Sequence, residues 1–147
     1  MPIYNPLIKV QVDQNIYQNL AGKKTAEFTT ELLSPSDTQQ FFLPLGKTFL
    51  LFRVITSHPA RIRIYSTEAY RQADLNRLIG VDPSGEMGLI LEAITSQQNL
   101  DLDLAPLVWG ANLAGKPSPN IPFSLTNLQM GASVQVTLKL LFIEAEI

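Results

Sequence analysis

Residues 48–65 read TFLLFRVITSHPARIRIY, and this stretch decides the fold. Its first half, Thr48–Thr56, is almost wholly apolar, which is typical of a strand covered on both faces. Its second half, Ala60–Tyr65, alternates, so that two isoleucines face one way and two arginines and a tyrosine face the other. Between the halves, His58-Pro59 breaks the strand, because proline lacks a backbone N–H and keeps its predecessor extended. The stretch predicts two β-strands joined by a tight reversal.

The period of two that marks a β-strand continues on both sides of this stretch. Clusters of turn-forming residues at 34–37 and 82–85 separate the apolar segments. The segment Phe41–Leu45 is a further run of apolar residues, and it leads into Gly46. Further strands are expected at residues 8–13, 27–33, 87–95, 100–109, 121–126 and 134–140.

One α-helix is expected at residues 68–78. Ser66 or Thr67 can cap its start, and Glu68 places a carboxylate in the first turn, where it favours the positive end of the helix dipole. Gly80 is a natural stop just after its end. This helix interrupts a chain that otherwise reads as strands.

About eight or nine short strands with one inserted helix indicate an all-β fold. We expect an antiparallel β-sandwich of jelly-roll type rather than a series of βαβ units. The sequence has no internal repeat, no low-complexity tract and no block of charge that would mark a linker. We therefore expect residues 1–147 to form a single domain.

The composition restricts the class of protein. Of the residues, 46% are hydrophobic and only 16% are charged, with a formal net charge of −2, whereas an average soluble domain has roughly 25% charged residues. Disorder is therefore not expected. The low surface charge predicts that another chain covers part of the surface, either a second copy in a homo-oligomer or another protein subunit.

The sequence shows neither a membrane-spanning segment nor a signal peptide for secretion. No apolar run approaches the roughly 18 to 20 residues of a membrane span. Residues 1–20 lack the basic start and apolar stretch of a signal peptide. We expect a protein that is cytoplasmic or particle-associated and that has no membrane partner.

Residues that could supply chemistry are few. Cysteine is absent and His58 is the only histidine, which excludes thiolate sites and multi-histidine zinc sites. His58 could act as the base for a nucleophilic serine or threonine, but no nucleophile motif accompanies it. We favour the alternative that His58 is a structural residue of the hairpin. Asp101 and Asp103 share a strand face and could hold Ca²⁺, but we favour the alternative that they form a solvent-facing acidic stripe.

Glycine-rich loops that bind phosphate are missing from the sequence. We expect no cofactor, no metal and no enzymatic activity.

All five arginines fall between residues 53 and 77. Together with nearby tyrosines they could grip a carboxylate or stack on a sugar or base. Nucleic acid is disfavoured, because the net charge is negative and no basic domain is present. The structural alternative, which we favour, is that the arginines pair with carboxylates of this chain or of a neighbouring subunit. The candidate binding residues are Arg61, Arg63, Tyr65, Tyr70, Arg71, Arg77 and Trp109.

Trp109 is the one tryptophan and precedes Gly110 and a proline-rich loop. It could provide a platform on which a sugar ring stacks, as in many β-sandwich lectins. A single tryptophan at the end of a strand more often belongs to a core or an interface, because its ring is first of all a large buried contributor. We favour the core or the interface.

Residues 60–89 form a unit with the strand ARIRIY, a helix containing Ala73-Asp74 and Arg77, and the turns Gly80, Asp82-Pro83 and Gly88-Leu89. This unit resembles small β-sandwich proteins of phage particles and tail-like assemblies, with the pattern ARxRLY, AD, R, G, DP, GL. Residues 121–142 are similar to the VTN motif and long final strand of the same proteins. The resemblance covers about half of the chain and implies a structural or receptor-facing role in a multi-subunit particle.

Two functions follow as expectations. The first is a non-enzymatic assembly subunit that self-associates or docks on partner proteins by burying apolar strand faces, with arginines pairing across the contact. The alternative is a module that binds a carbohydrate or another small ligand through Trp109, Tyr65 and the arginines.

Overall fold

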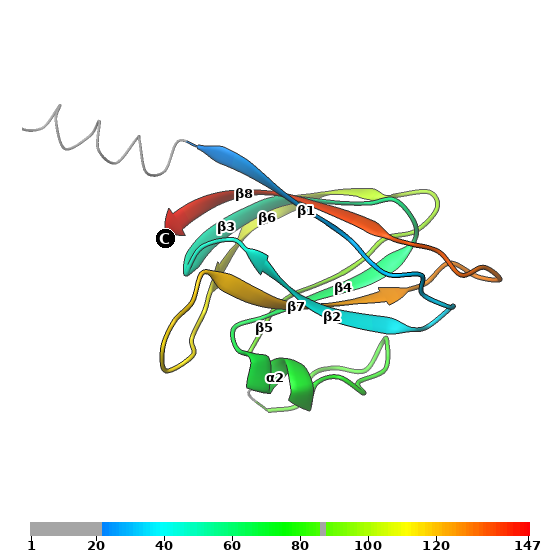
Figure 1. Ribbon diagram of the computed structural model, residues 1–147, viewed down its shortest axis with the longest axis horizontal. Helices are drawn as coiled ribbons and strands as arrows, with labels where there is room; N and C mark the ends of the chain where they lie inside the picture. Colours follow the sequence, from blue (N-terminus) through cyan, green and yellow to red (C-terminus); the bar gives the residue numbers. More distant parts are fainter. Residues whose placement is uncertain (1–21, 86–87) are drawn as a thin grey trace, which may run out of the picture.

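The computed structural model describes residues 22–85 and 88–147, in which the strands pack as two sheets (Figure 1). The first sheet has the strand order β1-β8-β3-β6, and the second sheet has the order β2-β7-β4-β5. All neighbouring strands in both sheets are antiparallel. The strands are β1 (Lys23–Thr29), β2 (Thr38–Pro44), β3 (Thr48–Thr56), β4 (Ala60–Tyr65), β5 (Leu89–Ile94), β6 (Asp101–Ala111), β7 (Asn120–Asn127) and β8 (Thr137–Glu146).

The chain passes repeatedly between the two sheets. Of the described strands, only β4 and β5 follow each other within one sheet, and every other connection crosses to the opposite sheet. The predicted all-β antiparallel sandwich is confirmed. The interleaved strand order also supports the jelly-roll type.

The predicted strand bounds agree with the structure to different degrees. β3 and β4 span the residues that their patterns predicted, and the later strands recur as β5 to β8 with shifted bounds. The strand expected at residues 27–33 is displaced, because β1 ends at Thr29 and Leu33 makes only an isolated bridge with Val134. The strand expected at residues 8–13 lies outside the described residues.

The core lies between the inner faces of the two sheets. Burial of aliphatic and aromatic side chains there is the main stabilising term, at about 1.5 to 3 kcal/mol for each large side chain. Two aromatic rings from opposite sheets, Phe28 of β1 and Phe41 of β2, stack with their centroids 3.9 Å apart. The completely buried core residues of the central strands include Phe49, Leu51, Val54, Ile62, Ile64, Ile121, Phe123, Leu125, Leu138 and Leu140.

β3 has one buried face and one that is only half-buried. The expectation that both faces are covered is wrong, because residues on its outer face such as Leu50 and Ile55 remain partly exposed. A bulge between Leu51 and Arg53 shifts the register with both neighbouring strands. The extra residue keeps Arg53 on the outer face and returns Val54 to the core.

The helix α2 (Glu68–Ala73) lies against the outer face of the second sheet (Figure 1). Thr67 caps its start by accepting a hydrogen bond from the Tyr70 N–H at 3.2 Å. The expected helix at residues 68–78 is too long, since α2 ends where Asp74 turns into the protein. The Asp74 carbonyl accepts a hydrogen bond from Arg63 at 2.9 Å, so a contact with β4 replaces further helical turns.

Candidate functional site

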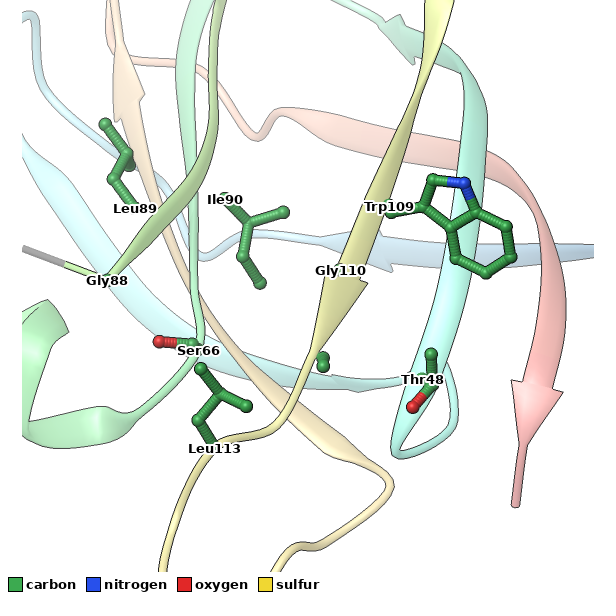
Figure 2. A pocket seen from close by; sticks show the side chains of 9 residues that line it. Thr48, Ser66, Gly88, Leu89, Ile90, Trp109, Gly110 and Leu113 are labelled. Carbon is green, nitrogen blue, oxygen red and sulfur yellow. The ribbon is translucent and has the colours of Figure 1, made fainter.

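An apolar groove of about 430 Å³ opens between β5 and β6, the edge strands of the two sheets (Figure 2). β5 belongs to the second sheet and β6 to the first, so the groove lies where the two layers meet along one side of the sandwich. It is lined by Thr48, Ser66, Gly88, Leu89, Ile90, Trp109, Gly110, Ala111 and Leu113.

Two glycines give the groove its shape. A Cβ atom on Gly110 would come within 2.2 Å of the Phe49 ring and 3.1 Å of Ile90, so only glycine lets β6 approach both. Gly88 has a φ of +54°, and a Cβ atom there would come within 2.2 Å of the Tyr70 ring. Both positions require glycine for the strands to meet as they do.

Trp109 lies at the groove on the exposed side of β6. Trp109 is 64% exposed, and Leu113 is 69% exposed. Figure 2 shows Trp109 on the same side of β6 as Thr48, with Leu89 and Ile90 on the other side. Trp109 therefore does not belong to the core, which leaves an interface or a ligand platform among the roles expected for it.

The groove offers little hydrogen-bonding capacity. Its two hydroxyl side chains are those of Thr48 and Ser66. Thr48 donates to the Glu146 carboxylate at 3.0 Å, and the Ser66 hydroxyl is buried without a hydrogen-bond partner in the described structure. Aliphatic and glycine surface makes up most of the remaining wall.

The arginines expected to bind a ligand or partner lie inside the protein. β4 is buried along its whole length, because the core covers its inner face and α2 with the segment after it covers its outer face. The side chains of four arginines are between 1% and 6% exposed, so these arginines do not present a surface for another chain. They are Arg61, Arg63, Arg71 and Arg77.

Carboxylates of the same chain pair with these guanidinium groups. Glu92 of β5 contacts Arg61 at 2.8 Å and Arg77 at 2.6 Å. Asp74 contacts Arg77 at 2.7 Å and lies 3.8 Å from Arg63. The contacts therefore show the internal pairing that was the favoured structural alternative.

The two carboxylates of this network, Asp74 and Glu92, are held in their ionised form. Burial by itself raises the pKa of Asp74, but hydrogen bonds from Arg77 and Tyr65 outweigh it and bring the pKa below its usual value. The pKa of Glu92 is likewise lowered, since hydrogen bonds from Arg77 and Arg61 outweigh the effect of burial. Burial and the hydrogen bond to Asp74 raise the pKa of Tyr65 to about 12.

Arg71 and Tyr70 connect α2 to the rest of the protein. Arg71 donates to the carbonyl oxygens of Phe41 at 2.8 Å and Phe123 at 3.2 Å, and its guanidinium lies 4.6 Å from the centroid of the Phe42 ring. It also contacts Glu68, three residues earlier on the helix, at 3.3 Å. The Tyr70 ring packs over Gly88, next to the groove.

The acidic stripe on β6 pairs with an arginine on β3. Asp101 receives two hydrogen bonds from Arg53, and Asp103 lies 3.6 Å from the same guanidinium. No three histidine, aspartate or glutamate side chains of residues 22–85 and 88–147 converge as a metal site. His58 Nδ1 lies 2.9 Å from the Ser57 hydroxyl, which accepts a hydrogen bond from the Thr137 N–H.

Sequence reasoning found Trp109 but not the groove beside it. Ile90, Gly110 and Leu113 come from segments whose proximity depends on how the two sheets meet. The dipeptide Trp109-Gly110 at a strand end was the available signal, since a glycine inside a strand often marks a close approach.

In the part of the chain that the structure describes, no helix has the length and hydropathy needed to cross a membrane. Comparison of the chain with models of protein families, with curated proteins and with solved structures finds no match.

Proposed function

We propose that this protein is a non-enzymatic assembly subunit that associates with further copies of itself through the groove between β5 and β6. The observation that carries the proposal is the exposed Trp109 ring beside an apolar groove at the two sheet edges. A large aromatic side chain next to a pocket is the usual anchor of a protein interface, because its burial contributes most of the binding free energy.

The two halves of β6 differ in their suitability for contact. The first half carries Asp101 and Asp103, and Pro106 follows, all of which discourage pairing with another strand. The second half carries Leu107 and Trp109, which are 49% and 64% exposed. We therefore place the contact on the second half of β6 and on the adjoining groove.

The partner in this proposal is a second copy rather than a polar ligand. The groove wall is mainly aliphatic and supplies few donors or acceptors for sugar hydroxyls. The whole chain has 16% charged residues, which favours a surface that is covered in an assembly. The resemblance to small β-sandwich proteins of phage and tail-like particles adds to this proposal, and we propose such a particle as the setting.

The experiment is light scattering over a range of protein concentrations, comparing the wild-type chain with Trp109→Ser. We expect an oligomer for the wild type and dissociation constants raised at least tenfold for the variant, as for a central interface residue. Met130→Ser is the matched control, because Met130 is 86% exposed and lies between β7 and β8.

Two outcomes would contradict the proposal. One is a wild-type chain that stays monomeric at every concentration. The other is an oligomer that Trp109→Ser and Met130→Ser weaken equally. Circular dichroism and the thermal midpoint of each variant verify that the sandwich is intact, which an exposed position should allow.

The exposed ring also favours the second candidate, a carbohydrate-binding module. In that case Trp109 fluorescence should shift on titration with a glycan, and the wild-type chain should be a monomer. A spectrum that does not respond to a broad glycan panel would count against this function without affecting the first.

A further inference from the structure

A second cavity, of about 720 Å³, lies on the outer face of the second sheet. Thr38 of β2, Thr126 of β7 and Arg61 of β4 are opposite one another across the three strands and supply part of its wall. Arg63 follows two residues along β4. The segment after α2, including Leu78 and other apolar residues, forms another part of the wall.

Positive charge exceeds negative charge at this cavity. Three guanidinium groups line it, those of Arg61, Arg63 and Arg77. Two carboxylates contact these groups, Asp74 and Glu92. Three positive charges less two negative charges leave one positive charge without an equivalent partner.

Arg63 carries this excess. A guanidinium has five N–H donors, and Arg63 makes one hydrogen bond within the described structure, from Nη1 to the Asp74 carbonyl. Its Nε is buried without a partner, and its side chain is 1% exposed. The nearest carboxylate oxygen, on Asp74, is 3.8 Å away and accepts a much shorter hydrogen bond from Tyr65.

The other walls supply a hydroxyl and an apolar region. Thr38 and Thr126 share one hydrogen bond of 2.6 Å, so one hydroxyl proton of the pair is left to donate elsewhere. Leu75, Leu78 and Ile79 supply the apolar part. A buried guanidinium with unused donors, an available hydroxyl and aliphatic walls are complementary to an organic acid.

We propose that this cavity binds a small aliphatic carboxylate, with the carboxylate group on Arg63 and the hydrocarbon part against Leu78 and its apolar neighbours. The site is separate from the groove at β5 and β6 and does not depend on self-association.

The test is titration of the full chain with hexanoate, with hexanamide as the neutral control and inorganic phosphate as the compact anion. Calorimetry measures affinity, and the NMR signal of the Arg63 Nε–H reports contact with the ligand. We expect saturable binding of hexanoate, a shift of the Arg63 signal, and affinities at least tenfold weaker for hexanamide and phosphate.

Two variants locate the binding. Arg63→Gln should weaken hexanoate binding at least tenfold, whereas Arg53→Gln, on the other sheet, should bind as the wild type does. If Arg63→Gln does not fold, Leu78→Glu is the variant that tests whether hexanoate binds at this cavity. Leu78 is 72% exposed, and a negative charge at the cavity should repel hexanoate without affecting the fold.

Several results would overturn the assignment. Hexanamide binding as tightly as hexanoate would show that charge is not recognised. Tighter binding of phosphate would assign the site to inorganic anions. Absence of hexanoate binding, an unmoved Arg63 signal, or unchanged affinity in Leu78→Glu would each exclude carboxylate binding at this cavity.

Discussion

Arginine–carboxylate pairs occur on the outer faces of both sheets, and their surroundings differ. On the first sheet, Arg53 of β3 contacts Asp101 of β6, with side chains 40% and 44% exposed. On the second sheet, Arg77 contacts Glu92 of β5, with side chains 6% and 22% exposed. The residue types are the same, but water reaches the first pair freely and the second pair very little.

The difference comes from what covers each sheet. α2 and the segment that follows it lie on the second sheet, whereas no helix in the described part of the chain covers the first (Figure 1). A charge that is removed from water is costly unless it is paired, and breaking a buried pair leaves its partner uncompensated. The same pair at a surface is screened by solvent. The covered network should therefore respond strongly to substitution and the exposed pair weakly.

The largest effect is expected from Asp74→Ala, which removes a carboxylate with no exposed side-chain surface. Arg77 and the Tyr65 hydroxyl would lose their acceptor, and Arg63 its nearest negative charge. We expect a loss of about 3 to 5 kcal/mol in the free energy of unfolding. Urea denaturation measures it, and a loss no greater than that of Asp101→Ala would contradict the comparison.

A smaller loss, of about 2 kcal/mol, is expected from Glu92→Gln. The glutamine keeps the shape but removes the charge that faces Arg61 and Arg77. Glu92 is 22% exposed, so water can partly replace it. Denaturation at neutral pH checks the value, and an unchanged midpoint would show that Asp74 alone neutralises the network.

Acid should weaken the covered network. The pKa values of Asp74 and Glu92 are lowered in the folded protein, so their stabilisation is complete above the unfolded values of about 4 and is lost as pH falls through the folded values. Each carboxylate can add at most about 1.4 kcal/mol per pH unit to the slope. Asp74→Asn should therefore lose stability less steeply than the wild type below about pH 4, and parallel curves would contradict this.

The smallest effect is expected from Arg53→Ala on the first sheet. Its pair with Asp101 is open to solvent, so removal should leave the thermal midpoint nearly unchanged and should abolish only a weak dependence on salt. Differential scanning calorimetry at low and high salt checks this. A drop comparable to that of Glu92→Gln would mean that covering the sheet is not what distinguishes the two pairs.

Much of this contrast could not be predicted from the sequence. The alternation of Ala60–Tyr65 correctly placed the arginines and isoleucines on opposite faces, because a strand has a period of two whatever covers it. The pattern did not indicate that both faces are buried. That depends on Asp74, which ends α2 and brings the following segment onto the sheet through contacts with β4.

The groove shows the same limit. The strand ending in Trp109 was predicted, but the exposure of the Trp109 side chain depends on which sheet edge the strand occupies. The alternation of apolar and polar residues does not determine strand order. Gly110 and Ile90 come together only because β5 and β6 belong to different sheets that meet there. Local periodicity predicts elements, whereas sites made between sheets require the topology.

The bulge in β3 determines how this strand can change in evolution. Inserting or deleting one residue in a regular strand exchanges its inner and outer sides from that point onward. In β3 the bulge near Arg53 already provides one such half-period shift, so a bulge-free pairing of the same residues would direct Arg53 inward and Val54 outward, whereas deletion of the extra residue would leave Val54 in the core. Length variation should therefore be tolerated in the turns on either side of this strand, and a one-residue deletion within the strand should be tolerated only at the bulge.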